Sequence, residues 1–257
     1  MQDVCMKPLT SSTVQRNPLT LSIHTAPTLL APAQTSSLPD TACTLWFAET
    51  GGSNSLSDWE ALLGSEERER AHRFHFPEDW RRYVYGRGLL RWLLGIYLGL
   101  DPAALKFTYS EHGKPELAAG ISPRPLHFNL SHSGAKLLLA FAWDRRVGVD
   151  VEQITGNRDL EQIANRFFSP AERAALRALD ADTRKEAFYL CWSRKEAFLK
   201  AMGGGLSMPL DQFDVALHPG QPAALLATRP DSEEASRWAM HGLDVGSGYA
   251  AAVVVER

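Results

Sequence analysis

The sequence has few cysteines, no long apolar run and little net charge, and each of these shortages argues against a class of protein. Cys5, Cys43 and Cys191 lie too far apart for the spacing of a metal site, so we expect reduced thiols in a cytoplasmic protein. No apolar stretch approaches the roughly 20 residues of a membrane span, and the N-terminal segment lacks the order of a secretory signal. A net charge of −3 gives no support to a general nucleic-acid or membrane surface.

The composition is that of an ordinary globular protein, apart from the N-terminal segment. At 257 residues and 44% hydrophobic composition, the chain is long enough to bury the core of one large or two small domains. Residues 1–42 are rich in Ser, Thr and Pro and are predicted to form a flexible extension. We predict an N-terminal lobe over residues 43–144 and a C-terminal lobe over residues 145–257.

An acidic strand is predicted at the start of the second lobe. From Val147 to Glu152, β-branched residues alternate with Gly148, Asp150 and Glu152, which indicates a strand that carries both acids on one face. Residues two apart on a strand are separated by about 6.6 Å, so an Asp and a longer Glu can converge on one cation. An exposed acidic edge strand explains the same pattern equally well.

A long helix is predicted downstream, from Thr183 to Met202, because this stretch contains neither Pro nor Gly. Asp182 is the expected N-cap, and the glycines that begin at Gly203 are expected to end the helix. Most of its circumference is apolar, whereas a narrow polar face carries Tyr189, Ser193, Glu196 and Lys200.

Lys195 falls inside the apolar arc of that helix. An unpaired ammonium group there would be costly unless it reaches solvent or meets an anion. Together with Glu196, Lys200 and the acidic strand, it suggests a pocket for a phosphoanhydride bound to a metal ion.

Four motifs in this order resemble those of the 4′-phosphopantetheinyl transferase family. Residues 113–115 resemble GKP, residues 128–133 resemble FNxSHS, residues 148–152 resemble GxDxE, and residues 192–200 resemble WxxKEAxxK. The resemblance extends from about Leu45 to the C-terminus, with the spacing of the monomeric, two-lobed type. It implies an α+β fold with pseudo-two-fold symmetry, in which each lobe has a small, mainly antiparallel sheet packed on a long helix.

The resemblance also implies a reaction and the residues that perform it. The 4′-phosphopantetheine arm of coenzyme A would pass to a serine of an apo acyl or peptidyl carrier protein, with Mg²⁺ or Mn²⁺ as cofactor and 3′,5′-ADP as product. Asp150, Glu152 and Glu196 are expected to bind the metal. Asp150, Glu196 and Lys200 are expected to be catalytic, and the serine proton would pass to Glu196 or to a metal-bound water.

A second set of residues is expected to bind coenzyme A itself. The resemblance implies that basic residues in this part of the chain bind the 3′-phosphate of coenzyme A. Glu67 stands where relatives often carry a lysine, so one of these contacts is left without a predicted residue. The predicted contacts are Arg70, Arg82, Lys114, Ser131, His132, Lys195 and Lys200.

Two other functions fit the same acids. One is a Mg²⁺-dependent hydrolase or nucleotidyltransferase acting on a nucleotide pyrophosphate, which would not need a carrier protein. The other is a module that binds coenzyme A without releasing 3′,5′-ADP. Ser131 and His132 do not indicate a serine hydrolase, because adjacent residues do not readily form a nucleophile-to-base hydrogen bond and no G-x-S-x-G surrounds them.

Overall fold

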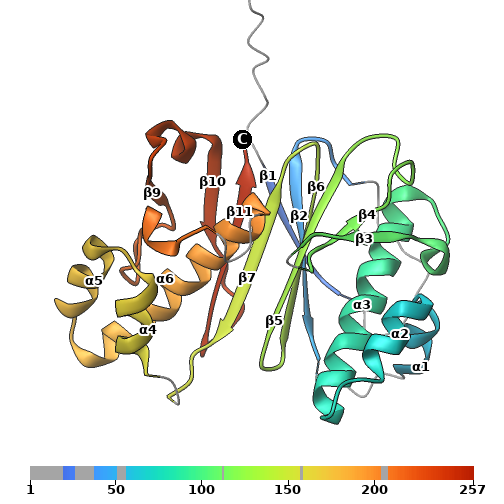
Figure 1. Cartoon of the computed structure of the whole chain (residues 1–257), viewed down its shortest axis with the longest axis horizontal. Coiled ribbons are helices and arrows are strands. Elements are labelled where there is room, and N and C mark those ends of the chain that lie inside the picture. Colours follow the sequence, from blue (N-terminus) through green and yellow to red (C-terminus); the bar gives the residue numbers. More distant parts are fainter. Residues whose placement is uncertain (1–19, 27–37, 51–55, 112, 157–158, 204–207) are drawn as a thin grey trace, which may run out of the picture.

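The computed structural model describes residues 20–26, 38–50, 56–111, 113–156, 159–203 and 208–257. Two lobes lie side by side, each made of a sheet with helices on its outer face (Figure 1). No helix in these ranges is both long and apolar enough to cross a bilayer.

The N-terminal lobe is built on a four-stranded sheet with the order β1-β2-β6-β5. β1 runs parallel to β2, and the other neighbours are antiparallel. A small hairpin of β3 and β4 lies beside this sheet. The elements are β1 (Thr20–Thr25), β2 (Ala42–Glu49), α1 (Leu56–Ala61), α2 (Ser65–Ala71), α3 (Pro77–Leu98), β3 (Phe107–Tyr109), β4 (Pro115–Leu117), β5 (Leu126–Ser133) and β6 (Lys136–Trp143).

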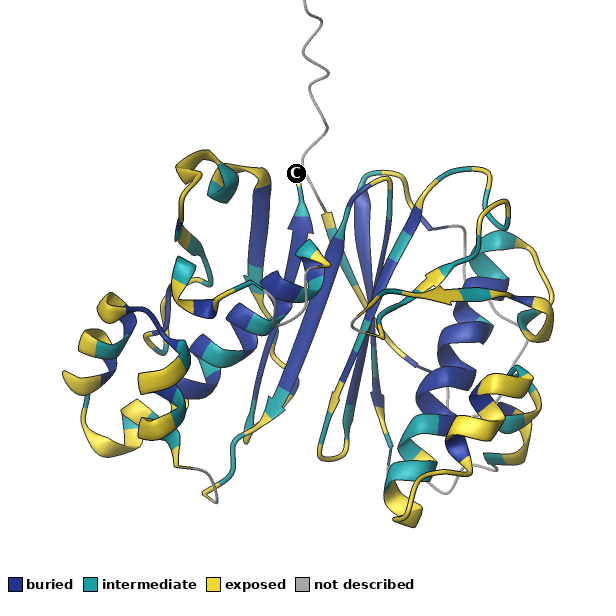
Figure 2. Cartoon of the chain, viewed as in Figure 1, coloured by how far each residue is buried: buried dark blue, intermediate teal, exposed yellow. Residues whose placement is uncertain are grey.

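α3 is the long helix of this lobe. Pro77 occupies its first turn, where the missing N–H costs nothing, and Gly99 ends it in the left-handed conformation at φ 65°. Its inward face is buried against the sheet, together with Leu137, Leu139 and Phe141 of β6 (Figure 2).

The C-terminal lobe has a three-stranded antiparallel sheet with the order β10-β11-β7. A second hairpin, of β8 and β9, lies at its outer side. The elements are β7 (Val147–Gln153), α4 (Leu160–Phe167), α5 (Pro170–Arg177), α6 (Ala181–Met202), β8 (Phe213–Val215), β9 (Leu225–Thr228), β10 (Trp238–Gly242) and β11 (Tyr249–Glu256).

α6 is the counterpart of α3 and begins earlier than the sequence predicted. The Asp180 carboxylate accepts a hydrogen bond from the Thr183 N–H at 3.1 Å, so Asp180 is the N-cap and the prediction of Asp182 was wrong. Both acids precede the same apolar pattern, and only the backbone geometry distinguishes them. Gly203 ends the helix at φ 76°, as predicted; the two glycines after it lie outside the described residues.

The two sheets face one another across a shared apolar layer. Val147, Val149 and Val151 of β7 point into this layer and meet alternate residues of β6, such as Leu138 and Ala140. The other face of β7 lies against α6, so that each sheet separates its own helix from the partner lobe. The lobes are therefore joined by a continuous core.

The predicted α+β class with two lobes, each a small sheet on a long helix, is confirmed. Within residues 1–42, expected to form a flexible extension, residues 20–25 form β1, and Ala26 and Leu38 are buried. Residues 1–19 and 27–37 lie outside the described residues. The domain bounds therefore stay a prediction.

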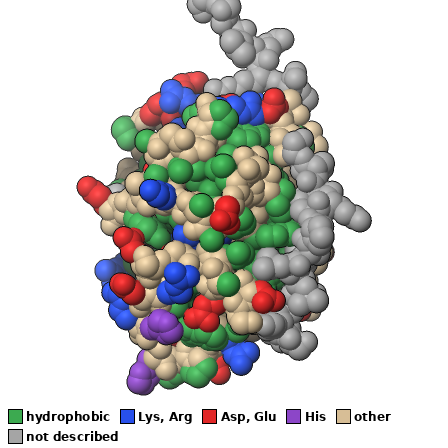
Figure 3. Space-filling model, turned by 90° about the vertical axis from the view of Figure 1, so that its right-hand side faces the viewer, with side chains coloured by type: hydrophobic (Ala, Val, Ile, Leu, Met, Phe, Trp, Pro, Cys, Tyr) green, Lys and Arg blue, Asp and Glu red, His purple; other side chains and the backbone are tan. Residues whose placement is uncertain are grey.

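Charges of both signs are interspersed on the outer face of the N-terminal lobe (Figure 3). On α2, Glu66, Arg68, Glu69 and Arg70 are exposed, whereas Glu67 is buried. The charge-dense segment is thus mainly a solvated helix face.

Candidate active site

β7 presents its two acids to α6, on the face that the period-two pattern predicted. Asp150 is 3% exposed and Glu152 is half-buried. Gly148, on the same face, touches the helix backbone directly. A Cβ atom at Gly148 would lie 2.1 Å from the Ala197 carbonyl oxygen and 2.3 Å from the Ala201 nitrogen. Glycine is thus required there for α6 to approach β7 closely.

Side chains of β5 hold β7 in register from the opposite lobe. The Val149 N–H donates to Asn129 Oδ1 at 2.8 Å. The Gln153 N–H donates to Ser133 Oγ at 3.0 Å. Alternate residues of β5 therefore bridge the two sheets. Ser131 to Ser133 belong to this strand.

Lys200 and Asp150 form the centre of the site. Lys200 Nζ lies 2.6 Å from Asp150 Oδ1 and 3.1 Å from Ser131 Oγ, which itself donates to the same Asp150 oxygen at 2.8 Å. Burial raises the pKa of Asp150, and Lys200 and Ser131 partly offset this rise. The other oxygen, Oδ2, is buried without a hydrogen-bond partner.

Glu152 and Glu196 line the same hollow as Asp150 and Lys200. Glu152 accepts a hydrogen bond from Ser133 Oγ at 3.2 Å. Desolvation raises the pKa of Glu196; Lys200 opposes the rise, and the charges of Asp150 and Glu152 add to it. Three carboxylates thus face one small space beside a lysine.

No three His, Cys, Asp or Glu side chains in the described part of the chain are already arranged as a metal centre. The donor chemistry nevertheless fits a hard divalent cation, since the hollow offers carboxylate oxygens and one of them, Asp150 Oδ2, has no partner. Lys200 occupies the other oxygen of Asp150.

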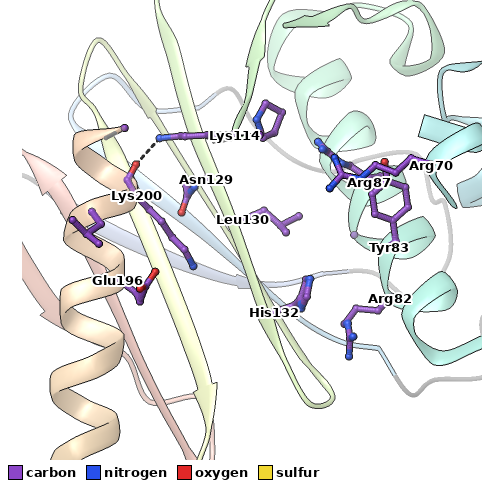
Figure 4. A pocket seen from close by; sticks show the side chains of 15 residues that line it. Arg70, Arg82, Tyr83, Arg87, Lys114, Asn129, Leu130, His132, Glu196 and Lys200 are labelled. Carbon is purple, nitrogen blue, oxygen red and sulfur yellow. Dashed lines mark hydrogen bonds between the residues drawn. The ribbon is translucent and has the colours of Figure 1, made fainter. Parts of the chain in front are cut away.

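The hollow opens into a cleft of about 550 Å³ between the lobes. Glu196 and Lys200 lie on the α6 side, whereas Arg70, Arg82 and His132 come from the N-terminal lobe (Figure 4). Arg82 already pairs with Asp79, one turn earlier on α3. Desolvation lowers the pKa of His132, and the nearby Arg82 and Lys200 charges lower it further, which favours the neutral imidazole.

Lys114 lines the cleft, but its ammonium group is bound to backbone. Lys114 Nζ donates to the Lys200 carbonyl oxygen at 2.7 Å, in the last turn of α6, and to the Val147 carbonyl oxygen at 3.5 Å (Figure 4). Burial lowers its pKa to about 8. A loop of the N-terminal lobe thus holds the end of the helix that carries Lys200.

Lys195 is absent from the cleft, which corrects its prediction as a coenzyme-binding residue. It is fully buried, and its Nζ lies 2.8 Å from Glu172 Oε2 and within 2.7 Å of the Leu210 and Phe213 carbonyl oxygens. Of the two predicted outcomes, contact with solvent or with an anion, the structure shows the second, and the anion is Glu172. Lys195 therefore ties α6 to α5, to Leu210 and to the first residue of β8.

Glu67 is buried within the N-terminal lobe. Its carboxylate lies 2.5 Å from Arg91 Nε and accepts the Gly64 N–H at 3.0 Å, which secures the start of α2. Its charge is therefore neutralised within the lobe.

The sequence interpretation missed several residues that build or line the site. Asn129 and Ser133 position β7, and the alternation of polar residues in residues 129–133 was the signal for them. Tyr83 and Arg87 line the cleft from α3. The sequence carries no comparable signal for these two, because polar and apolar residues are spread around α3 without a distinct polar face.

Fold and site together define a two-lobed α+β enzyme whose interlobe cleft combines carboxylates with lysine and arginine, as a substrate rich in phosphate requires. A model described as the 4′-phosphopantetheinyl transferase superfamily matches residues 146–254. A model of the N-terminal part of 4′-phosphopantetheinyl transferases matches residues 53–144.

Three relatives are named as members of the same family. The chain is 41% identical to the 4′-phosphopantetheinyl transferase HetI of Nostoc sp. over 202 residues, which cover 79% of this chain and 82% of HetI. It is 39% identical to the transferase Sfp of Bacillus subtilis over 194 residues, covering 75% and 82% of the two chains. With another Bacillus subtilis 4′-phosphopantetheinyl transferase it shares 41% identity over 158 residues, covering 61% and 67%.

The chain belongs to the 4′-phosphopantetheinyl transferase family. The predicted activity, transfer of the phosphopantetheine arm of coenzyme A to carrier proteins, is confirmed by this membership. Hydrolysis of a pyrophosphate and simple binding of coenzyme A are therefore set aside as its function.

Proposed function

We propose that the hollow between β5, β7 and α6 is where the pyrophosphate of coenzyme A is cleaved and the arm transferred. The observation that carries this proposal is the contact of Lys200 with Asp150, beside Glu196 and Glu152. A lysine and three carboxylates on one cleft wall suit a reaction in which charge moves from one phosphate oxygen to another.

Asp150, Glu152 and Glu196 would hold Mg²⁺ or Mn²⁺, and the unpartnered Asp150 Oδ2 supports this assignment. When bound, such an ion neutralises the charge of the pyrophosphate. Ser131 keeps the Asp150 carboxylate oriented through its 2.8 Å hydrogen bond.

Glu196 and Lys200 would move the proton and the charge. The serine oxygen of the carrier forms a bond to the phosphorus of the arm, while the bond from that phosphorus to the bridging oxygen breaks. The serine proton passes to Glu196, whose pKa is raised by desolvation, and the electron pair leaves with 3′,5′-ADP. The Lys200 ammonium group stabilises the charge on that departing phosphate.

The replacement of Glu196 by Gln tests this assignment. We expect transfer to an apo carrier protein to fall by about 100-fold or more, because general base catalysis typically contributes about 10²–10⁴-fold. Intact-mass measurement of the carrier reports the product. The control is Glu186→Gln, on the exposed part of the same helix, which should transfer at the wild-type rate. A near wild-type rate for Glu196→Gln would remove Glu196 from the reaction.

We also propose that the protein acts as a monomer in the cytoplasm. One chain supplies both walls of the cleft, so no second copy is needed to complete the site. Cys43 and Cys191, the two cysteines in the described ranges, are buried free thiols, which suits a reducing compartment. The acceptor would be the serine of an acyl or peptidyl carrier protein.

A further inference from the structure

The seam between the two lobes is formed by β5 and β7, each the last strand of its own sheet (Figure 1). Three side chains of β5, spaced two residues apart, accept three alternate N–H groups of β7. These pairs are Asn129 with Val149, Ser131 with Val151 and Ser133 with Gln153, at 2.8, 3.4 and 3.0 Å. Because the N–H groups of an edge strand need acceptors, these side chains take the place of a backbone ladder between the sheets.

Both serines of this seam also hold an acid of β7. Ser131 Oγ donates to Asp150 Oδ1 at 2.8 Å, and Ser133 Oγ donates to Glu152 Oε2 at 3.2 Å. A serine hydroxyl has a single hydrogen, and its lone pairs accept the N–H that follows the acid, so the hydrogen points at the carboxylate. The same arrangement therefore occurs twice, two residues apart on both strands.

Ser133 serves Glu152 from outside the hollow. Of the described residues that line the hollow, Glu152 is one and Ser133 is not, whereas Ser131 lines it and also contacts Lys200. A bound ion or substrate would thus meet Glu152, and Ser133 acts only through it. Glu152 is half-buried, and its long side chain loses rotamer freedom when it is fixed. A hydrogen bond that fixes it in advance lowers the entropy lost on binding.

We propose that Ser133 is a positioning residue that raises the affinity of the site for its divalent cation by fixing the orientation of the Glu152 carboxylate. This inference rests on the proposed function, in which Asp150, Glu152 and Glu196 hold the ion. Loss of a group that hydrogen-bonds to a metal ligand typically costs about 10- to 100-fold in metal affinity. Because Ser133 belongs to the N-terminal lobe and the three acids to the C-terminal lobe, the affinity for metal depends on the seam between the lobes.

The test measures Mn²⁺ binding to the protein alone, from the electron paramagnetic resonance signal of the free ion. Ser133→Thr and Ser133→Val have side chains of the same shape and differ in the hydroxyl group. We expect Ser133→Val to raise the Kd for Mn²⁺ by about 10-fold and Ser133→Thr to stay within about 2-fold of wild type. The Gln153 N–H loses its acceptor in Ser133→Val, but it belongs to an exposed residue, where water can replace the serine. If Ser133→Val does not fold, Ser133→Ala against Ser133→Thr gives the same comparison.

Transfer to an apo carrier protein gives a second readout. At low Mg²⁺ concentration, Ser133→Val should be slower than Ser133→Thr by about 10-fold, because less of the variant holds the ion. At saturating Mg²⁺ the two rates should agree within about 2-fold, because the positioning acts on affinity. A displaced strand would slow the reaction at every concentration of metal.

The control is Ser236→Ala, at an exposed serine that donates to a backbone carbonyl oxygen, and it should bind Mn²⁺ as wild type does. Equal Kd values for Ser133→Val and Ser133→Thr, or a deficit that saturating Mg²⁺ does not remove, would overturn the inference. Glu152→Gln separates it from the proposed function. A wild-type Kd for Mn²⁺ in Glu152→Gln would remove Glu152 from the metal site. A weakened Glu152→Gln beside an unchanged Ser133→Val would leave the metal ligands standing and overturn the role of Ser133 alone.

Discussion

At the scale of single residues, Lys114 shows how an expected ligand contact can be a structural one. The glycine and proline beside it favour a fixed loop, which agrees with the expectation that its side chain has a defined partner. That partner, the Lys200 carbonyl oxygen, lies 86 residues further along the chain. Burial at this junction lowers the pKa of Lys114 to about 8. This shift makes stability depend on pH.

We predict that Lys114 increases the free energy of unfolding as pH rises above 8. Below pH 8 the lysine is protonated in both states, so its contribution is constant. Between pH 8 and the ordinary lysine value near 10.5, the unfolded state binds the proton and the folded state does not, which favours folding as pH rises. Urea unfolding at pH 7.5 and 9.5 should show wild type gaining about 1 kcal/mol over Lys114→Met, reduced from the full shift by partial exposure.

Lys106→Met, at an exposed lysine in the same lobe, is the control and should follow the wild-type pH dependence. Parallel curves for wild type and Lys114→Met would show that the ammonium group is solvated.

Lys195 is a second lysine whose partner the sequence alone did not identify. Its place on the helix predicted that it either reaches solvent or meets an anion, and the fold shows that it meets Glu172 and not a substrate phosphate.

At the scale of elements, the contact between β7 and α6 sets the geometry of the acids. Gly148 allows the helix backbone to lie against the strand, and Asp150 and Glu152 follow on the same face of the strand. The alternation of residues 147–152 was enough to predict this strand and the shared face of its acids. The distance between β7 and α6 depends on the absence of a side chain at Gly148. The alternation of residues along the strand does not predict this distance.

Gly148→Ala is predicted to destabilise the protein and to impair transfer. The added methyl group would overlap the Ala197 carbonyl and the Ala201 nitrogen, and backbone atoms cannot rotate away as a side chain can. We expect the free energy of unfolding to fall by about 3 kcal/mol, at the upper end of overpacking costs. Displacement of α6 should also lower the transfer rate under conditions where the variant is fully folded.

The matched change is Gly156→Ala, where an added Cβ meets nothing within 4 Å, and its stability should stay within about 0.5 kcal/mol of wild type. Equal stabilities for the two variants would mean that the helix does not rest on β7 at Gly148.

Other elements were harder to predict from the sequence. Thr20–Thr25 forms β1 from a segment rich in Pro and Ser because the edge of β2 offers it backbone partners, and this is a tertiary effect.

At the scale of the whole molecule, the interlobe core couples the two halves of the cleft. The two lobes were predictable from motif order, whereas their mode of contact was not, since the valines of β7 would suit any apolar neighbour. Val147, Val149 and Val151 are at most 1% exposed, and their neighbours come partly from β6 of the other lobe. Separating the lobes would expose this whole layer to water.

We therefore predict that the described fold unfolds as one cooperative unit. Five of the seven tryptophans lie in the N-terminal lobe, so tryptophan fluorescence reports mainly on that lobe. Far-UV circular dichroism reports the helices of both lobes, so a comparison of the two signals shows whether the lobes unfold separately. In urea, both signals should give the same midpoint. Val149→Ala, which trims the layer between the sheets, should lower the free energy of unfolding by about 2 kcal/mol and move both midpoints together. Two midpoints in wild type, or a shift of only one signal in the variant, would show that each lobe is stable alone.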